Sequence, residues 1–254
     1  MQLTDTHCHI HSTDYPLPIA DVDANCEQAG VTRLICVGTD ADDSERAVHF
    51  VRDRPNSWAS IGQHPHEAKF GMKPLEKLRA LLRRADSKIV AIGECGLDYF
   101  YGHSPKADQE KALRYQIELA LEHDLPIIFH VRDAFDDFWP IFDSYQGVRG
   151  ELHSFTDNLT HLDKALSRGL YIGVNGIMTF TKNDWQLEVV KRIPDEKILL
   201  ETDSPFLTPR PLRGKVNEPA NVLRTAEYIG DLRQTSVTEL AAQTTNNARR
   251  LFSI

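Results

Sequence analysis

The sequence contains no long apolar run: no stretch approaches the roughly 20 consecutive apolar residues that a transmembrane helix needs. No basic region followed by an apolar segment opens the chain, so we expect no signal peptide. The four cysteines are scattered and form no CxxC pair, which is typical of a reduced intracellular protein. These absences predict a cytoplasmic protein with no membrane segment.

An excess of positive charge is also absent, because 29 Lys and Arg residues stand against 37 Asp and Glu, a net charge of −8. This balance argues against a protein held to nucleic acid by a general basic field. If the substrate is a polyanion, local basic side chains or metal ions must offset the net negative charge of the protein. No linker, low-complexity segment or repeat interrupts residues 1–254, so we expect one domain.

Short apolar runs alternate with longer amphipathic segments along the chain. Runs rich in Val, Ile and Leu are typical of strands that are buried on both faces of a parallel sheet. The predicted strands are residues 3–10, 33–38, 58–62, 89–94, 126–130, 150–154, 170–175 and 198–203. Eight strand–helix units predict an α/β protein with a (β/α)₈ TIM barrel, for which about 250 residues is usual. A doubly wound open sheet is the alternative, and the pattern of candidate ligands favours the barrel.

Helical patterns lie between these runs. Leucines at helical spacing predict helices over residues 75–84 and 107–123, and Asn158 is expected to cap a third that ends before Gly169. Residues 236–252 predict an extra C-terminal helix after the eighth unit. The segment 208–219, rich in Pro and basic residues, follows the last strand and is a candidate wall of the site.

Candidate metal ligands stand where apolar strands end. His7 and His9 share one strand face, because side chains alternate along a strand, and such a pair forms half of a divalent-metal site. Glu94 follows four apolar residues, and a buried carboxylate needs a partner such as a metal ion. Strands five, six and eight are followed by His130, His153 and Asp203. Because barrel active sites lie at the carboxyl ends of the strands, this shared position predicts a metal-dependent hydrolase.

Other polar residues allow two interpretations. His64, after the third strand, either contacts substrate or relays a proton, or it is structural. His66 either supports a residue of the site or is structural. Glu201 either adjoins the site or pairs with a lysine. The histidines predicted to be solvated are His49, His103, His123 and His161.

Several motifs occur in a fixed order along the chain. They are DTHCH at residues 5–9, GQHPH at 62–66, GECGLD at 93–98, HVRD at 130–133, HSF at 153–155 and ETDSP at 201–205. In this order they resemble the motifs of the TatD-like deoxyribonucleases, a family of the amidohydrolase superfamily of metal-dependent barrels. The resemblance spans almost the whole chain and extends to RGK at 213–215 and EPA at 218–220.

The resemblance implies a DNase with two divalent ions. It implies that His7, His9 and Asp203 bind one ion. His130 and His153 would bind the other, with Glu94 bridging the two. By their donor chemistry, four histidines and two carboxylates suit Zn or Mn, whereas phosphate chemistry often uses Mg.

The mechanism expected from these residues is hydrolysis of phosphodiester bonds by metal-activated water. Asp203, His64 and Glu94 are the candidate catalytic residues, and Asp203 is the candidate base. Arg132 is expected to steady the phosphate with His64. Arg213 and Lys215, with Arg210, either cradle a single strand of DNA or form a solvated basic loop.

Two other functions fit the same residues. A hydrolase of amides, esters or lactones would use the same metal site, because the ions polarise a carbonyl equally well. A noncatalytic scaffold would bind metal tightly without turnover, and the complete ligand set with a candidate base argues against it. We expect a monomer that acts on DNA and not on membranes.

Overall fold

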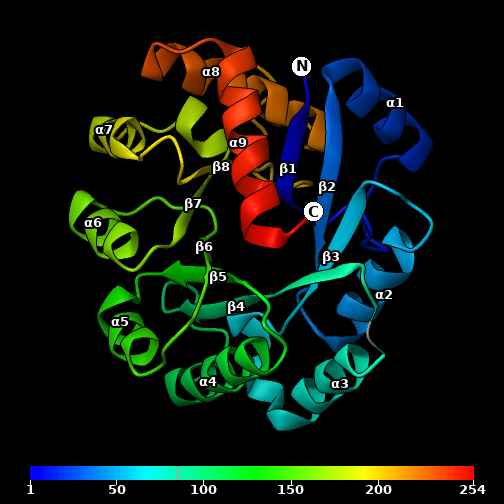
Figure 1. Ribbon diagram of the computed structural model, residues 1–254, viewed down its shortest axis with the longest axis vertical. Helices are drawn as coiled ribbons and strands as arrows, with labels where there is room; N and C mark the ends of the chain where they lie inside the picture. Colours follow the sequence, from blue (N-terminus) through cyan, green and yellow to red (C-terminus); the bar gives the residue numbers. More distant parts are fainter. Residues whose placement is uncertain (85) are drawn as a thin grey trace. The chain divides into compact units, whose positions relative to one another are not determined.

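The computed structural model describes residues 1–84 and 86–254, which form eight strands ordered β1 to β8 in one sheet (Figure 1). The strands are β1 (Leu3–Cys8), β2 (Val31–Val37), β3 (Ser57–Ile61), β4 (Ile89–Asp98), β5 (Ile127–Arg132), β6 (Gly150–Leu152), β7 (Tyr171–Val174) and β8 (Ile198–Leu200). The paired strands run parallel, for example β4 with β5 and β7 with β8. The predicted TIM-barrel fold is confirmed.

Helices alternate with the strands. They are α1 (Ile19–Ala29), α2 (Ala41–Val51), α3 (Met72–Leu82), α4 (Lys106–Glu122), α5 (Phe135–Asp143), α6 (Leu159–Ser167), α7 (Asp184–Arg192), α8 (Val222–Arg233) and α9 (Val237–Phe252). Short 3-10 helices are η1 (Pro65–Phe70), η2 (Gly176–Thr179) and η3 (Pro219–Asn221). The predicted extra helix is α9, and Ser236 caps it by accepting a hydrogen bond from Glu239 N. No helix among the described residues combines the length and apolar character that crossing a membrane requires.

The main difference from the predicted boundaries concerns β4. We expected this strand to end at Glu94, but its pairing with β5 continues to Asp98, opposite Arg132. The two backbones come very close here, since a Cβ on Gly96 would lie 1.8 Å from the carbonyl oxygen of His130. Glycine at this position therefore lets the strand continue past Glu94, the polar residue at which the sequence pattern predicts its end.

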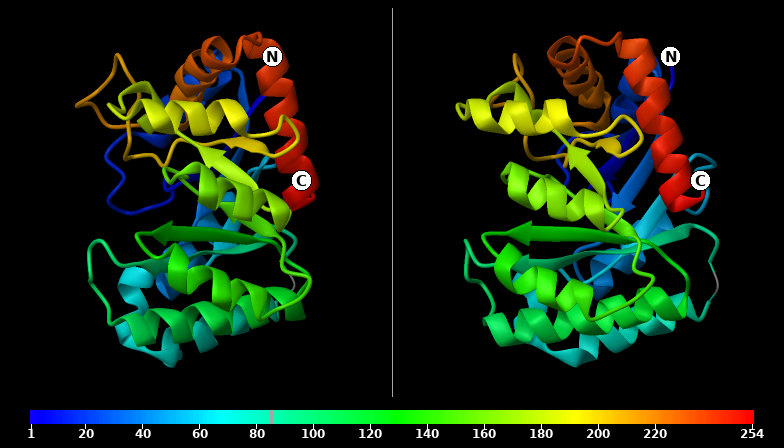
Figure 2. Two further views of the ribbon diagram at one scale, coloured as in Figure 1. Left: turned by 90° about the vertical axis from the view of Figure 1, so that its left-hand side faces the viewer. Right: turned by 60° about the vertical axis from the view of Figure 1, so that its left-hand side comes forward.

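Two compact units divide the chain, one made of Met1–Cys36 with Ser154–Ile254 and the other of Val37–His153. In the first unit, α9 packs on β1 and β8, as the red helix in Figures 1 and 2 shows. Asn247 donates to Ile198 O at 2.9 Å, and the Thr245 hydroxyl donates to Gln2 O at 3.1 Å. These contacts are at the amino-terminal ends of β8 and β1, so α9 leaves their carboxyl ends open for the site.

The carboxyl ends of β1 and β8 are joined to each other. Asp203 N donates to His7 O at 2.8 Å, and His9 N donates to Ser204 O at 2.8 Å. The buried Asp5 carboxylate accepts from Thr202 N at 2.9 Å and so ties residues 197 positions apart. The two ends of the chain thus meet in one unit.

In the second unit, α4 packs against β4, and two of its buried glutamines bind backbone at strand ends. Gln116 accepts from Gln63 N at 2.7 Å and donates to Gln63 O at 3.1 Å. Gln109 does the same for Asp98, at 2.7 and 3.1 Å. Each amide satisfies backbone groups as a neighbouring strand would, which fixes the segments that carry His64 and Asp98.

Candidate metal centre

The first ligand group consists of His7, His9 and Asp203, all in the first unit. His7 lies in β1, His9 follows it, and Asp203 follows β8. The Nε2 atoms of the two histidines are 3.3 Å apart. Asp203 Oδ1 lies 3.6 Å from His7 Nε2 and 3.3 Å from His9 Nε2.

These distances allow a test of fit to a metal ion. Ligands at about 2.0–2.1 Å from a tetrahedral ion are about 3.3–3.4 Å from one another. The three donor atoms of the first ligand group therefore already have the spacing of one coordination sphere. The His7 side chain is fully buried, so its donor atom faces the other two donors and not solvent.

The second ligand group consists of Glu94, His130 and His153, all in the second unit. Glu94 Oε1 lies 2.8 Å from His130 Nδ1 and 3.6 Å from His153 Nε2. Glu94 is only 4% exposed. A buried carboxylate surrounded by imidazole nitrogens has the donor chemistry of a divalent-metal site.

Asp98 decides which nitrogen of His130 is available to a metal. Burial alone would raise the pKa of Asp98. Hydrogen bonds from His130, the Tyr101 backbone and His66 lower the pKa by more than burial raises it, so the net pKa lies well below the usual range. The ionised carboxylate only accepts, and its Oδ2 is 3.0 Å from His130 Nε2. Nε2 therefore keeps its hydrogen, and Nδ1 is the nitrogen that can bind an ion beside Glu94.

The His130 ring is held firmly in this position. Burial alone would lower its pKa, but the hydrogen bonds to Asp98 and Glu94 outweigh burial and raise it. A cation at Nδ1 would displace the proton that this raised pKa retains, so metal binding and protonation compete.

His64 is close to Glu94, and its hydrogen bonds differ from those of His130. Its Nδ1 accepts from His66 N at 3.1 Å, and burial lowers its pKa to about 3. A neutral ring whose Nδ1 accepts must carry its hydrogen on Nε2, which is 3.6 Å from Glu94 Oε1. Nε2 is therefore a donor and not a metal ligand.

Other residues singled out by the sequence have structural contacts. Glu201 is fully buried, and its Oε1 accepts from Ser154 N at 2.8 Å and Asn175 Nδ2 at 3.0 Å. It therefore orients the residue that follows His153. His103 is exposed, as expected, but its ring contacts that of His66, with centroids 4.6 Å apart.

The basic candidates are exposed and partly engaged with aromatic rings. Arg213 lies 3.8 Å from the centroid of Phe180 and donates to Thr208 O at 2.9 Å. Arg132 lies over Phe100, at 4.0 Å. Lys215 is exposed in the same loop as Arg213. Their roles in substrate binding stay predictions.

Asp98 contacts the candidate ligand His130 but was not among the candidate site residues predicted from the sequence. A signal was present, because Glu94 and Asp98 are four residues apart on one strand and so share a face. A strand predicted to end at Glu94 excludes Asp98, so the shared face was missed.

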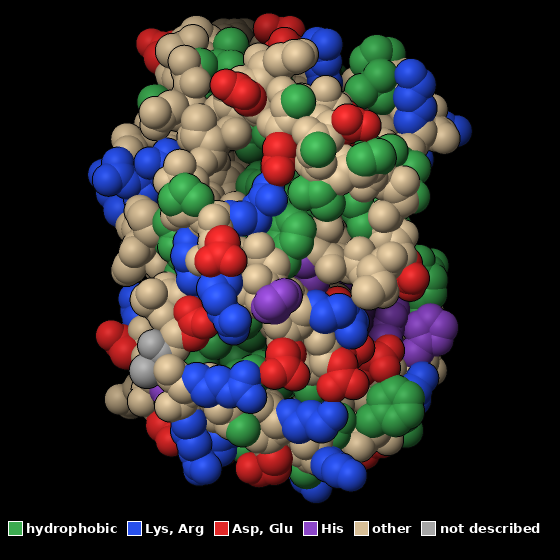
Figure 3. Space-filling view, turned by 90° about the vertical axis from the view of Figure 1, so that its right-hand side faces the viewer, with side chains coloured by type: hydrophobic (Ala, Val, Ile, Leu, Met, Phe, Trp, Pro, Cys, Tyr) green, Lys and Arg blue, Asp and Glu red, His purple; other side chains and the backbone are tan. Residues whose placement is uncertain are grey.

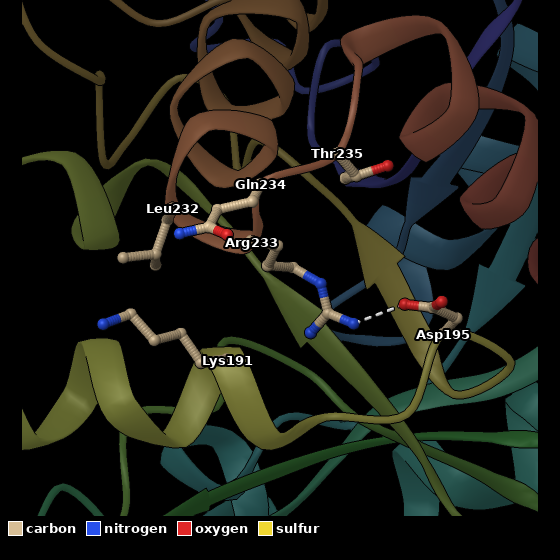
Figure 4. Close-up of a pocket in the computed structure, with 6 residues that line it drawn as sticks. All are labelled: Lys191, Asp195, Leu232, Arg233, Gln234 and Thr235. Atoms are coloured by element: carbon tan, nitrogen blue, oxygen red, sulfur yellow. Dashed lines mark hydrogen bonds and ion pairs between the residues drawn. The ribbon is translucent and has the colours of Figure 1, made fainter.

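A pocket of about 370 Å³ elsewhere in the first unit lies between the carboxyl ends of α7 and α8 (Figure 4). Its lining residues are Lys191, Asp195, Leu232, Arg233, Gln234 and Thr235. Arg233 donates to Asp195 at 2.5 Å and to Val190 O at 2.6 Å. Since α7 precedes β8, this pocket is on the amino-terminal side of β8 and is separate from the ligand groups.

Comparison with known proteins identifies the family of this chain. A family model for TatD-related DNases matches residues 4–253. The chain is 39% identical over 256 residues to the uncharacterized metal-dependent hydrolase YabD of Bacillus subtilis, covering 99% of both chains. It is 35% identical over 259 residues to the 3'-5' ssDNA/RNA exonuclease TatD of Salmonella typhimurium, covering 98% of both.

Structural comparison gives the same result. The crystal structure of YjjV, a TatD homolog from Escherichia coli, matches with a TM-score of 0.91 at 30% identity, covering 99% of this chain and 98% of that one. Fold and relatives define a metal-dependent hydrolase on a TIM barrel. The chain belongs to the family of TatD-related DNases.

Proposed function

We propose that this hydrolase, as one domain over residues 1–254, cleaves phosphodiester bonds in single-stranded nucleic acid, chiefly DNA, with two divalent cations. The observation that carries the proposal is the donor spacing of 3.3–3.6 Å in the first ligand group. The relative named as an ssDNA/RNA exonuclease supports the choice of substrate. We also expect the protein to be a cytoplasmic monomer.

We propose that each ligand group binds one ion, with the bridging role of Glu94 carried over from the resemblance. Four histidines and two carboxylates suit zinc or manganese, whereas phosphate chemistry often uses magnesium. Bound ions of this kind activate water and stabilise negative charge on the phosphate and the leaving oxygen.

The chain's own residues supply the remaining steps. The Asp203 carboxylate would accept the proton of the attacking water. His64 Nε2–H would donate to a phosphate oxygen, since its hydrogen is fixed on that nitrogen by the His66 contact. Arg132, Arg213 and Lys215 would bind backbone phosphates locally. Local binding matters because basic and acidic side chains are intermixed on the face shown in Figure 3.

The test is cleavage of end-labelled single-stranded DNA and RNA with magnesium, manganese or zinc, with EDTA as control. Glu94→Ala should abolish metal-dependent shortening, whereas Glu118→Ala, a surface carboxylate bonded to the Tyr145 hydroxyl, should not change it. If metal-loaded wild-type protein leaves both nucleic acids intact, the proposal fails. An amide, ester and lactone panel would then test the alternative hydrolase.

A further inference from the structure

An exposed aromatic cluster lies beside the second ligand group. Phe100 and Tyr101 lie two and three residues after the end of β4 and are 56% and 52% exposed. The Arg132 guanidinium, at the end of β5, lies 4.0 Å from the centroid of Phe100 and 4.8 Å from that of Tyr101. We call these three side chains the aromatic platform.

The platform is fixed to the same carboxylate that orients His130. Phe100 N and Tyr101 N each donate to Asp98 Oδ1 at 3.0 Å, while Asp98 Oδ2 faces His130 Nε2. Tyr99 N also donates to Arg132 O at 3.0 Å, which holds the two strand ends together. The platform therefore has a set position next to a candidate metal ligand, although its rings are exposed.

Histidine rings extend the cluster toward the ligand group. The His103 ring is stacked on Tyr101, at 5.6 Å and an interplanar angle of 7°. His66 meets the Tyr101 ring edge-on at 5.4 Å and shares Asp98 with His130. Phe100 meets Tyr101 edge-on at 4.9 Å, so a series of ring contacts, most of them edge-on, leads from solvent through His66 toward the residues around Glu94.

The chemistry of the platform fits a nucleobase with its phosphate. Exposed rings give a stacking surface that accepts any base, and a guanidinium both stacks and pairs with phosphate. An apolar protein partner would use the rings but has no need of the cation between them. Bases stacked inside a duplex do not present a free face, so the same surface selects single strands.

We propose that Phe100, Tyr101 and Arg132 form a base-stacking subsite that holds one nucleobase of a single strand next to the phosphate to be cleaved. The occupant named here rests on the proposed nuclease function. The subsite adds a source of single-strand preference that the ligand groups alone do not supply.

The experiment compares cleavage of oligothymidine with that of an abasic oligomer of equal length, and measures binding of both by fluorescence anisotropy in EDTA. The double variant Phe100→Ala/Tyr101→Ala should raise the KM for oligothymidine by about 5- to 100-fold, the range for loss of a base–aromatic stack. The KM for the abasic oligomer and kcat should stay within about 2-fold, because stacking acts on binding.

Two matched variants serve as controls. Tyr101→Phe keeps the stacking ring, so the KM for oligothymidine should rise less than in the double variant. Phe50→Ala removes a ring that Arg54 covers at 4.6 Å. This pair lies at the end of α2, just before the start of β3, so its loss should have no effect.

The outcomes separate the subsite from the nuclease function. An unchanged KM for oligothymidine, or an equal rise for the abasic oligomer, overturns the subsite while the nuclease stands. If no nucleic acid is cleaved, the nuclease proposal fails, and the binding measured by anisotropy then decides whether the subsite proposal stands. Selective loss of oligothymidine binding in the double variant then supports the subsite, and unaltered or absent binding overturns it.

Discussion

Replacing Asp98 with asparagine tests how the structure orients His130. Asp98 Oδ2 accepts from His66 Nε2 and His130 Nε2, each at 3.0 Å. An asparagine amide can keep Oδ1 as acceptor for the backbone of Phe100 and Tyr101. Its NH₂ group, however, would face two donors in place of the carboxylate oxygen.

His130 can relieve this conflict only by moving its hydrogen from Nε2 to Nδ1, the nitrogen that faces Glu94. The ring would then lose the lone pair that binds the ion. Changes to a carboxylate that orients a histidine ligand cost about 10- to 100-fold in metal affinity or activity, which corresponds to about 1.4–2.7 kcal/mol. We expect Asp98→Asn to weaken metal binding within this range and to lower the rate in parallel.

The assay is metal titration against a competing chelator, with urea unfolding of the metal-free protein as a measure of folding. Asp42→Asn, a surface carboxylate 3.0 Å from Lys77 Nζ, is the matched control and should bind metal as wild type does. If Asp98→Asn binds metal with unchanged affinity at both sites, the assignment of the His130 nitrogens is wrong.

Three further predictions follow from other contacts. His64→Ala should lower turnover about 10- to 100-fold while metal content stays at the wild-type value, because Nε2 is a donor; loss of a metal on elemental analysis would contradict this. Removing metal with EDTA should lower the Tm by about 5 to 10 °C compared with protein at 100 times the Kd, as scanning calorimetry would show, and an unchanged Tm would argue against binding to the folded state. Ser236→Ala removes the cap of α9 and should destabilise the protein by about 0.5–2 kcal/mol in urea unfolding without changing metal affinity, whereas equal stability would show that the cap contributes nothing.

The fold could be predicted from the sequence because each strand is an apolar run between helical patterns. The predicted strand boundaries were less accurate where a polar residue lies inside a strand that continues to pair with its neighbour. Glu94 reads as the end of a strand, yet β4 pairs on to Asp98 because Gly93 and Gly96 allow close approach of β5. The sequence does not show which residue of the next strand lies opposite, so the apolar pattern alone placed the end of β4 four residues too early.

The site was predicted in its residue types more fully than in its hydrogen bonds. The sequence placed Glu94 and His130 at neighbouring strand ends, and the structure brings them to 2.8 Å. Which nitrogen of His130 faces Glu94, and that His64 is a donor, depend on Asp98 and on the His66 backbone. These contacts are set by ring rotations and turn geometry, which strand periodicity does not encode.

The link between β1 and β8 has a consequence for how the enzyme is made. His7 and His9 leave the ribosome early, but Asp203 and the backbone groups that hold them come near the end of synthesis. A growing or truncated chain that stops between residues 153 and 203 has the residues of the second ligand group but lacks a complete first one. Such an unfinished copy of this hydrolase is therefore expected to be inert, and activity is expected only once the chain has been translated past Asp203.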